Sequence, residues 1–169
     1  MINFEKTFKM KLIYVFRIND ETHKGLLKVG DATVSKDLSE EELSPNSSVL
    51  NKSAKRRIDS YTKTACIDYD LLYTELAIKT KNLNGIECKE AFRDYDVHRV
   101  LTNSGIQKMK KLNNTGKEWF KTDLETVKNA IAAVKNDMYS LSPEQISNDK
   151  SPIVFRPEQK KKKKKTLKN

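Results

Sequence analysis

The chain has 169 residues, of which 37% are hydrophobic and 33% are charged, and its formal net charge is +10. This composition allows one domain with one hydrophobic core and a heavily solvated surface. It excludes a membrane protein, because the longest unbroken apolar run, Leu12–Phe16, is far shorter than the ~20 residues of a membrane span. The residues after Met1 contain no signal-peptide core, so we expect a cytoplasmic protein without membrane contact.

The positive charge is concentrated at the C-terminus. Seven of the last ten residues are lysines, and without them the chain holds 26 basic and 23 acidic residues, a net charge of only +3. A block of like charges repels itself, which favours a disordered tail, although the same lysines would also suit a nonspecific contact to phosphates. We therefore expect a domain over residues 10–136, followed by a polar linker and a disordered Lys-rich tail over residues 137–169.

The first two predicted elements of the chain are strands. Lys11–Ile18 is rich in β-branched and aromatic residues, as is typical of a central strand, and Leu26–Gly30 is a second, shorter strand. The polar turn Asn19–Gly25 between them indicates a hairpin. Ser35–Lys52 combines polar residues with a proline and few apolar anchors, which predicts a mobile loop.

A helix is predicted from about Ser48, because apolar residues recur there at spacings of four, four and three. The residues of this face are Leu50, Ala54, Ile58 and Tyr61. Basic side chains crowd the remaining surface of the helix, namely those of Lys52, Lys55, Arg56 and Arg57.

The middle of the chain predicts a third strand and a second helix. The strand covers Asp68–Thr74 and continues into a short helix over Glu75–Lys79, after which Asn82–Lys89 is predicted to be a loop. The second helix covers Asp94–Thr102 and ends near Gly105.

A last strand and a last helix follow. Lys117–Lys121 is predicted to be extended, and Thr122 then caps a helix in which Glu125 completes a capping box. The buried stripe of this helix consists of Leu124, Val127, Ile131 and Val134. The order of the elements predicts a small α/β or α+β domain, with a mixed or antiparallel sheet of three to four strands flanked by helices.

Several short segments carry a resemblance to a known family. Ile13-Tyr14-Val15 lies on the first strand, Lys28-Val29-Gly30 ends the second, Arg57 lies on the first helix, and His98 follows Asp94 by four residues on the next helix. This spaced set resembles the GIY-YIG nuclease superfamily, in particular its branch of phage-derived DNA-binding domains, in which the second motif reads Lys-Ile-Gly. The downstream segment Glu118-Trp119-Phe120 is also similar to that branch, and the resemblance covers residues 10–136.

The resemblance implies a DNA-binding endonuclease that hydrolyses phosphodiester bonds with one divalent metal ion, Mg²⁺ or Mn²⁺. Asp94 matches the helix carboxylate that holds the metal, and Arg57 matches the arginine that stabilises charge on the phosphate. Tyr14 matches the tyrosine that orients or deprotonates the attacking water. One helix turn separates Asp94 from His98, so the imidazole would reach the same phosphate.

The chain departs from the family pattern at two positions. Asp94 replaces the usual glutamate and is one methylene shorter, and Lys28 replaces the tyrosine of the second motif. Lys28 would still bind a phosphate, and we expect it to contact DNA together with Gly30, Lys55 and Arg56. These departures favour the alternative function, a catalytically degenerate module that binds DNA for a partner.

Each predicted site residue also has an ordinary structural interpretation. Tyr14 would be a core aromatic, Gly30 a turn glycine, and Asp94 a helix N-cap. Arg56 competes with Arg57 for the phosphate role, and His98 would serve only as a capping or hydrogen-bonding residue. We expect Glu118 to be structural, with Trp119 and Phe120 in the core.

The C-terminal segment Phe155–Gln159 is similar to the short entry sequence of superfamily II helicases, although no ATP-binding loop follows it. Members of this nuclease branch occur fused ahead of restriction-type helicases, which suggests a superfamily II helicase as a partner and a role in restriction or defence. An RNA-binding or protein-interaction domain is a third class that the sequence leaves open.

Overall fold

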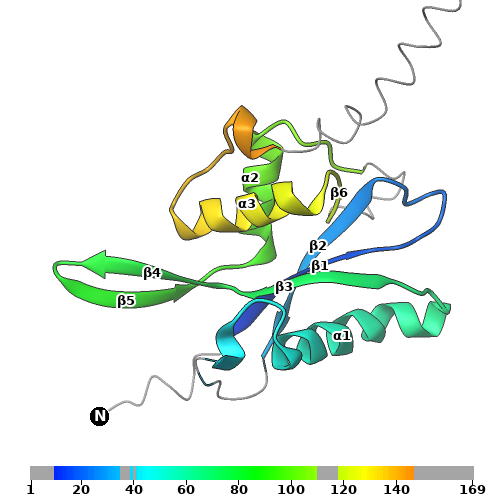
Figure 1. The fold of residues 1–169 in the computed structure, drawn as a ribbon, viewed down its shortest axis with the longest axis horizontal. Coiled ribbons are helices and arrows are strands. Elements are labelled where there is room, and N and C mark those ends of the chain that lie inside the picture. Colours follow the sequence, from blue (N-terminus) through cyan, green and yellow to red (C-terminus); the bar gives the residue numbers. More distant parts are fainter. Residues whose placement is uncertain (1–9, 35–38, 40, 110–117, 147–169) are drawn as a thin grey trace, which may run out of the picture.

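The computed structural model describes residues 10–34, 39, 41–109 and 118–146 (Figure 1). Three helices and two separate β-sheets make up this part of the chain. None of its helices has both the length and the apolar character that crossing a membrane requires. The helicase-like segment and the Lys-rich tail of the sequence lie outside the described residues.

A four-stranded antiparallel sheet forms the centre of the domain, in the order β3-β1-β2-β6. The strands are β1 (Lys11–Arg17), β2 (Leu26–Thr33), β3 (Asp70–Leu76) and β6 (Trp119–Lys121). The predicted central strand is confirmed, because β1 pairs with β2 on one side and β3 on the other. Its five consecutive buried residues explain the unbroken apolar run, since both faces of the strand are covered.

Helices cover both faces of this sheet (Figure 1). The helices are α1 (Ser48–Thr62), α2 (Asp94–Asn103) and α3 (Leu124–Lys135). Ile13 and Val15 of β1 point into a core shared with α2 and α3, whereas Tyr14 and Phe16 point into a second core under α1. The alternation of side chains along a strand thus produces two hydrophobic cores, and the predicted α+β class with an antiparallel sheet is confirmed.

The segment after β3 differs from the prediction. The helix expected over Glu75–Lys79 and the loop expected over Asn82–Lys89 are both wrong, because this segment forms a two-stranded hairpin of β4 (Ile78–Leu83) and β5 (Ile86–Ala91). Asn84 and Gly85 form its turn and both have positive φ, as a tight two-residue hairpin turn requires. The many polar residues obscured the strands, because the hairpin projects from the domain and no residue of either strand is buried (Figure 1).

Smaller differences concern where elements begin and end. β2 continues to Thr33, beyond the predicted end at Gly30, because it stays paired with β1. The cap of α3 is Asp123 and not Thr122: its carboxylate accepts a hydrogen bond from the Thr126 amide at 2.8 Å. The predicted loop Ser35–Lys52 includes a 3-10 turn and the first turn of α1, which Ser47 caps.

The chain keeps packing against the domain after α3. Leu141 is buried in the core shared by α2 and α3, and Ile146 packs against the same core. The Leu141 amide also donates a hydrogen bond to the Ser104 hydroxyl at 2.8 Å, which fixes the returning chain beside the end of α2. The described part of the segment after residue 136 therefore contributes to the fold.

The first prediction concerns the stability of a Gly30 variant. Gly30 faces Tyr14 across the strand pair, and a Cβ at this position would lie far inside van der Waals contact with the tyrosine ring and hydroxyl. We expect Gly30→Ala to lower the free energy of unfolding by about 2–3 kcal/mol in urea titrations, because the buried ring cannot move away freely. Combining it with Tyr14→Leu should cost less than the sum of the two single variants, and additive costs would contradict the clash.

Candidate functional site

Tyr14 lies beneath a second tyrosine that the sequence analysis did not assign to the site. Its side chain on β1 is only 2% exposed, and its hydroxyl lies 3.0 Å from the hydroxyl of Tyr61 on α1. Burial, followed by the hydrogen bond to Tyr61, raises the pKa of Tyr14 far above its usual range. Burial also raises the pKa of Tyr61, to about 12. Both phenols are therefore neutral at physiological pH, and Tyr61 is the more accessible of the two.

Arg57 extends from α1 toward this tyrosine pair. Its guanidinium carbon lies 5.7 Å from the centroid of the Tyr61 ring, and its charge favours the phenolate form of both tyrosines without outweighing their burial. Lys55 and Arg56 are exposed on the same helix. The structure therefore separates the two rival arginines, because Arg57 contacts the tyrosine pair and no ring contact, hydrogen bond or ion pair of Arg56 is found within the described residues.

Lys28 enters the same cluster from β2. Its ammonium nitrogen lies 4.5 Å from the Tyr61 ring centroid and 6.0 Å from that of Trp119, and it forms an ion pair with Glu118 at 3.3 Å. An ammonium over aromatic faces is stabilised by the ring quadrupoles. Lys28 is therefore held by rings and by a carboxylate, and only 17% of its side chain is exposed.

Glu118 is the functional candidate that the sequence analysis assigned to a structural role. Its backbone carbonyl accepts a hydrogen bond from the Val29 amide at 3.0 Å, which fixes the residue beside β2 just before β6 begins. Its negative charge contributes to raising the pKa of Tyr14, Tyr61 and Asp94. One carboxylate thus acts on groups from β1, α1 and α2. Its position next to Trp119 and Phe120, within a segment that carries the resemblance, was the available sequence signal.

Asp94 is the first residue of α2 and lies beside a second carboxylate, Asp31 of β2. The Asp94 amide donates to Asp31 Oδ2 at 3.1 Å, and the Arg93 Nε donates to the same oxygen at 2.6 Å. Burial opposes ionisation of Asp31, but these two hydrogen bonds outweigh it and hold the pKa of Asp31 below its usual value. The predicted alternative, an N-cap role for Asp94, is not what the structure shows, because Arg93 occupies the cap position.

The environment of Asp94 disfavours its charged form. Burial is the largest cause, followed by the negative charges of Asp31 and Glu118, and together they raise the pKa of Asp94 to about 6. A carboxylate that is held beside another carboxylate is stabilised by a cation. Asp94 is therefore in an electrostatic setting that favours a bound positive charge.

His98 is buried on α2, with only 8% of its surface exposed. Its Nε2 donates to the Val29 carbonyl at 2.7 Å, and its ring packs against Phe120 with centroids 5.2 Å apart. Burial lowers the pKa of His98 below its usual value, so the imidazole is neutral at physiological pH. The structure brings His98 to the edge of the cluster, but the nitrogen that faces β2 is already occupied by a backbone carbonyl.

The donor set of the cluster can be compared with the needs of Mg²⁺. Among the described residues, no group of three or more His, Cys, Asp or Glu side chains could hold a metal ion. Mg²⁺, however, usually keeps several waters and takes one or two protein carboxylates together with substrate phosphates. Asp94 offers one such carboxylate, whereas both oxygens of Asp31 are engaged by Arg93, so the residues present fit the predicted metal through Asp94 alone.

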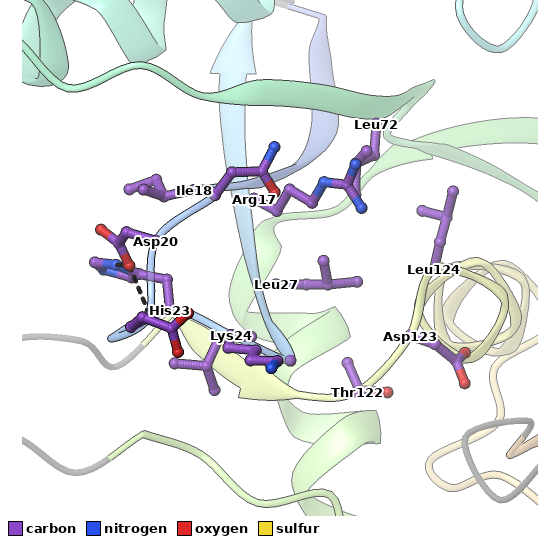
Figure 2. A pocket seen from close by; sticks show the side chains of 14 residues that line it. Arg17, Ile18, Asp20, His23, Lys24, Leu27, Leu72, Thr122, Asp123 and Leu124 are labelled. Atoms are coloured by element: carbon purple, nitrogen blue, oxygen red, sulfur yellow. Dashed lines mark hydrogen bonds and ion pairs between the residues drawn. The ribbon is translucent and has the colours of Figure 1, made fainter. Parts of the chain in front are cut away.

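A cavity of about 580 Å³ lies elsewhere, at the turn between β1 and β2 (Figure 2). Arg17, Leu72 and Thr122 line it, as does His23, whose Nδ1 is 2.7 Å from the Asp20 carboxylate. None of the predicted site residues lines this cavity. This cavity is therefore not the candidate site.

Comparisons with protein-family models, with curated proteins and with solved structures find no match.

The second prediction concerns how the charge on Asp94 affects stability at different pH values. Because its folded-state pKa lies above the ordinary value of 3.8, the proton that stabilises the folded state is lost as the pH rises through about 6. We expect Asp94→Asn to raise the free energy of unfolding by roughly 1 kcal/mol at pH 7.5, after a discount for the solvent that reaches this half-buried group, and by almost nothing at pH 4.

Urea titrations at the two pH values measure this difference. Asp68→Asn is the matched control, because Asp68 is an exposed acid for which the described residues offer no hydrogen-bond partner. A destabilised Asp94→Asn variant at pH 7.5 would contradict the unfavourable setting of the carboxylate.

Proposed function

We propose that this chain binds DNA and hydrolyses its phosphodiester bonds as a GIY-YIG-like endonuclease with a divalent metal ion, Mg²⁺ or Mn²⁺. One arrangement supports this proposal above all others: side chains from four elements are connected to Glu118, one by an ion pair, three through its charge, and Arg57 through the Tyr61 ring. They are Tyr14 of β1, Lys28 of β2, Arg57 and Tyr61 of α1, and Asp94 of α2. Four of these five were selected from the sequence for one common chemistry, although 80 positions separate Tyr14 from Asp94.

The basic surface of α1 supports DNA as the substrate. Four basic side chains occur between residues 52 and 57, and none of them takes part in an ion pair within the described residues. Lys28 and Arg93, by contrast, are paired with Glu118 and Asp31. A run of unpaired cations on one helix is what a phosphate backbone requires, because each contact releases a counterion.

In the proposed reaction, the residues of the cluster have different roles. Arg57 and Lys28 supply positive charge where the phosphate becomes more negative in the transition state. The hydroxyls of Tyr61 and Tyr14 form a hydrogen-bonded pair that orients a water. Asp94 would hold the metal ion, which when bound polarises a phosphate oxygen and offsets the repulsion between the carboxylate and the substrate.

Two observations favour the second candidate function, a DNA-binding module without catalysis. Tyr14 is almost fully buried and resists ionisation, and the described residues contain no group of three or more His, Cys, Asp or Glu side chains that could hold a metal ion. In that case Arg57 and the other cations of α1 grip phosphate, and the chain delivers a partner such as a superfamily II helicase to DNA. The helicase partner and the role in restriction remain predictions from the sequence.

Plasmid cleavage separates the two candidate functions. We expect the full chain to nick supercoiled plasmid in the presence of Mg²⁺ or Mn²⁺, and EDTA to abolish the nicking. Asp94→Ala should reduce the nicking by at least about 100-fold while DNA affinity stays near wild type, because a metal ligand contributes to the reaction more than to binding. Asp68→Ala is the matched control and should cleave normally. Full cleavage by Asp94→Ala would refute the metal-ligand role, and binding without any cleavage would favour the non-catalytic module.

DNA binding itself is tested on α1. Replacing Lys52, Lys55 and Arg56 together by alanine should weaken binding to duplex DNA at least tenfold at about 100 mM salt and reduce the slope of log affinity against log salt by about 2–3. The matched control removes the same charge from three exposed cations elsewhere, with the substitutions Lys24→Ala, Lys89→Ala and Arg99→Ala. Equal losses in the two triple variants would show that net charge alone drives the binding.

A further inference from the structure

We propose that Glu118, and not Tyr14, accepts the proton of the attacking water when this site hydrolyses a phosphodiester. This inference rests on the proposed nuclease function and assigns the general base within it. The sequence resemblance would give the water-activating role to Tyr14, so the two assignments make different experimental predictions.

Tyr14 and Glu118 differ in how accessible their side chains are to solvent. Tyr14 is 2% exposed, and its hydroxyl is already hydrogen-bonded to the hydroxyl of Tyr61. The Glu118 side chain is 40% exposed, and a general base must lie within hydrogen-bond reach of the water that it deprotonates. A solvent water can therefore approach Glu118 directly, whereas the Tyr14 hydroxyl is buried beside that of Tyr61.

Proton affinity points in the same direction. The phenol of Tyr14 stays protonated at physiological pH, because burial and the bond to Tyr61 oppose its ionisation. A neutral phenol can accept a proton only by becoming a cation, so Tyr14 can donate a hydrogen bond to the water-binding group but cannot take the proton. Tyr14 is then a positioning residue that orients Tyr61, and a carboxylate at the same cluster supplies the base.

The surroundings of Glu118 hold its carboxylate ready for this role. Its backbone is fixed to β2 by the hydrogen bond from Val29, and its Oε2 pairs with the Lys28 ammonium at 3.3 Å. The rings of Tyr61 and Trp119 hold that ammonium in place. Within the described residues Oε1 has no hydrogen-bond partner, so this oxygen is available to a water while the other oxygen is anchored.

In the proposed step, water displaces the leaving sugar oxygen from phosphorus. The water oxygen attacks phosphorus, and one of its protons passes to Glu118 Oε1. The bond between phosphorus and the leaving sugar oxygen breaks, the electron pair stays on that oxygen, and the oxygen takes a proton from solvent. Glu118 then returns its proton to solvent, so no oxidant, reductant or further co-reactant is needed.

Single-turnover nicking of supercoiled plasmid by the full chain, with protein and Mg²⁺ both saturating, tests this assignment. We expect Glu118→Ala to lower the rate constant by about 10²–10³-fold, which is the usual contribution of a general base. Adding formate should raise the rate constant of Glu118→Ala at least about tenfold, because a small carboxylate can occupy the space of the missing side chain. Tyr14→Phe should lose less than tenfold, since it removes only an orienting hydroxyl.

Lys28→Gln is the matched control, because it breaks the same ion pair from the other partner. It should lower both DNA affinity and the saturated rate, because Lys28 also supplies positive charge to the phosphate, and formate should not rescue either loss. Thermal unfolding and DNA affinity of Glu118→Ala and of the isosteric Glu118→Gln show that these variants still fold and bind.

Several outcomes would overturn the assignment. A loss of activity in Glu118→Ala that formate does not rescue counts against the base, as does cleavage within a few-fold of wild type. A higher Mg²⁺ requirement in Glu118→Gln, with an unchanged saturated rate, would make Glu118 a metal ligand instead. If the wild-type chain binds plasmid but never cuts it, the nuclease function itself fails and this inference fails with it.

Discussion

The short length of β6 is the constraint on which the candidate site depends. β6 pairs only with Leu26–Lys28, the first part of β2, and the edge of β2 would be left open beyond that point. A buried backbone group without a partner is costly, so other groups must complete the edge. The Glu118 carbonyl and the His98 imidazole do so at Val29. Completing the strand edge therefore brings a carboxylate and α2 to the same place.

The same constraint separates charges across the sheet edge. Negative groups gather on the side of α2, where Asp31 and Asp94 lie together, and positive groups gather on the side of α1, where Arg57 lies over Tyr61. Glu118 and Lys28 form an ion pair at the boundary between the two sides. On the side of α2 the Arg93 guanidinium already pairs with Asp31 at 2.6 Å, whereas no ion pair of Asp94 is found within the described residues. Asp94 is thus the carboxylate at which the proposed metal ion would offset the repulsion of a phosphate.

The elements that the sequence predicted best were those with strong periodicity. α1, α2 and α3 each have a buried face that their apolar spacing shows directly, and β1 shows as an unbroken apolar run because both of its faces are buried. The hairpin of β4 and β5 was missed because it projects from the domain, and a strand that is exposed on both faces has no apolar alternation to detect. Its Asn84-Gly85 turn was the available signal, and it was interpreted as part of a loop.

The site itself was predictable only in part, for a different reason. Tyr14, Arg57 and Asp94 could be selected because each matches a motif within its own segment. Tyr61 could not, because its apolar spacing on α1 assigned it to the core, and only the tertiary structure shows its hydroxyl beside that of Tyr14. Glu118 could not either, because its effect on three other elements follows from where β6 begins.

The presence of lysine at position 28 gains a physical explanation from these contacts. A tyrosine there would add a third phenol beside Tyr14 and Tyr61 and would leave Glu118 without a cation. Lys28 instead places its ammonium between the aromatic rings and the carboxylate, so that it stabilises a negative charge that is otherwise repelled by Asp94. The substitution that weakens the resemblance at the level of sequence is therefore coupled to the carboxylate of Glu118, and the two residues are best understood as one unit.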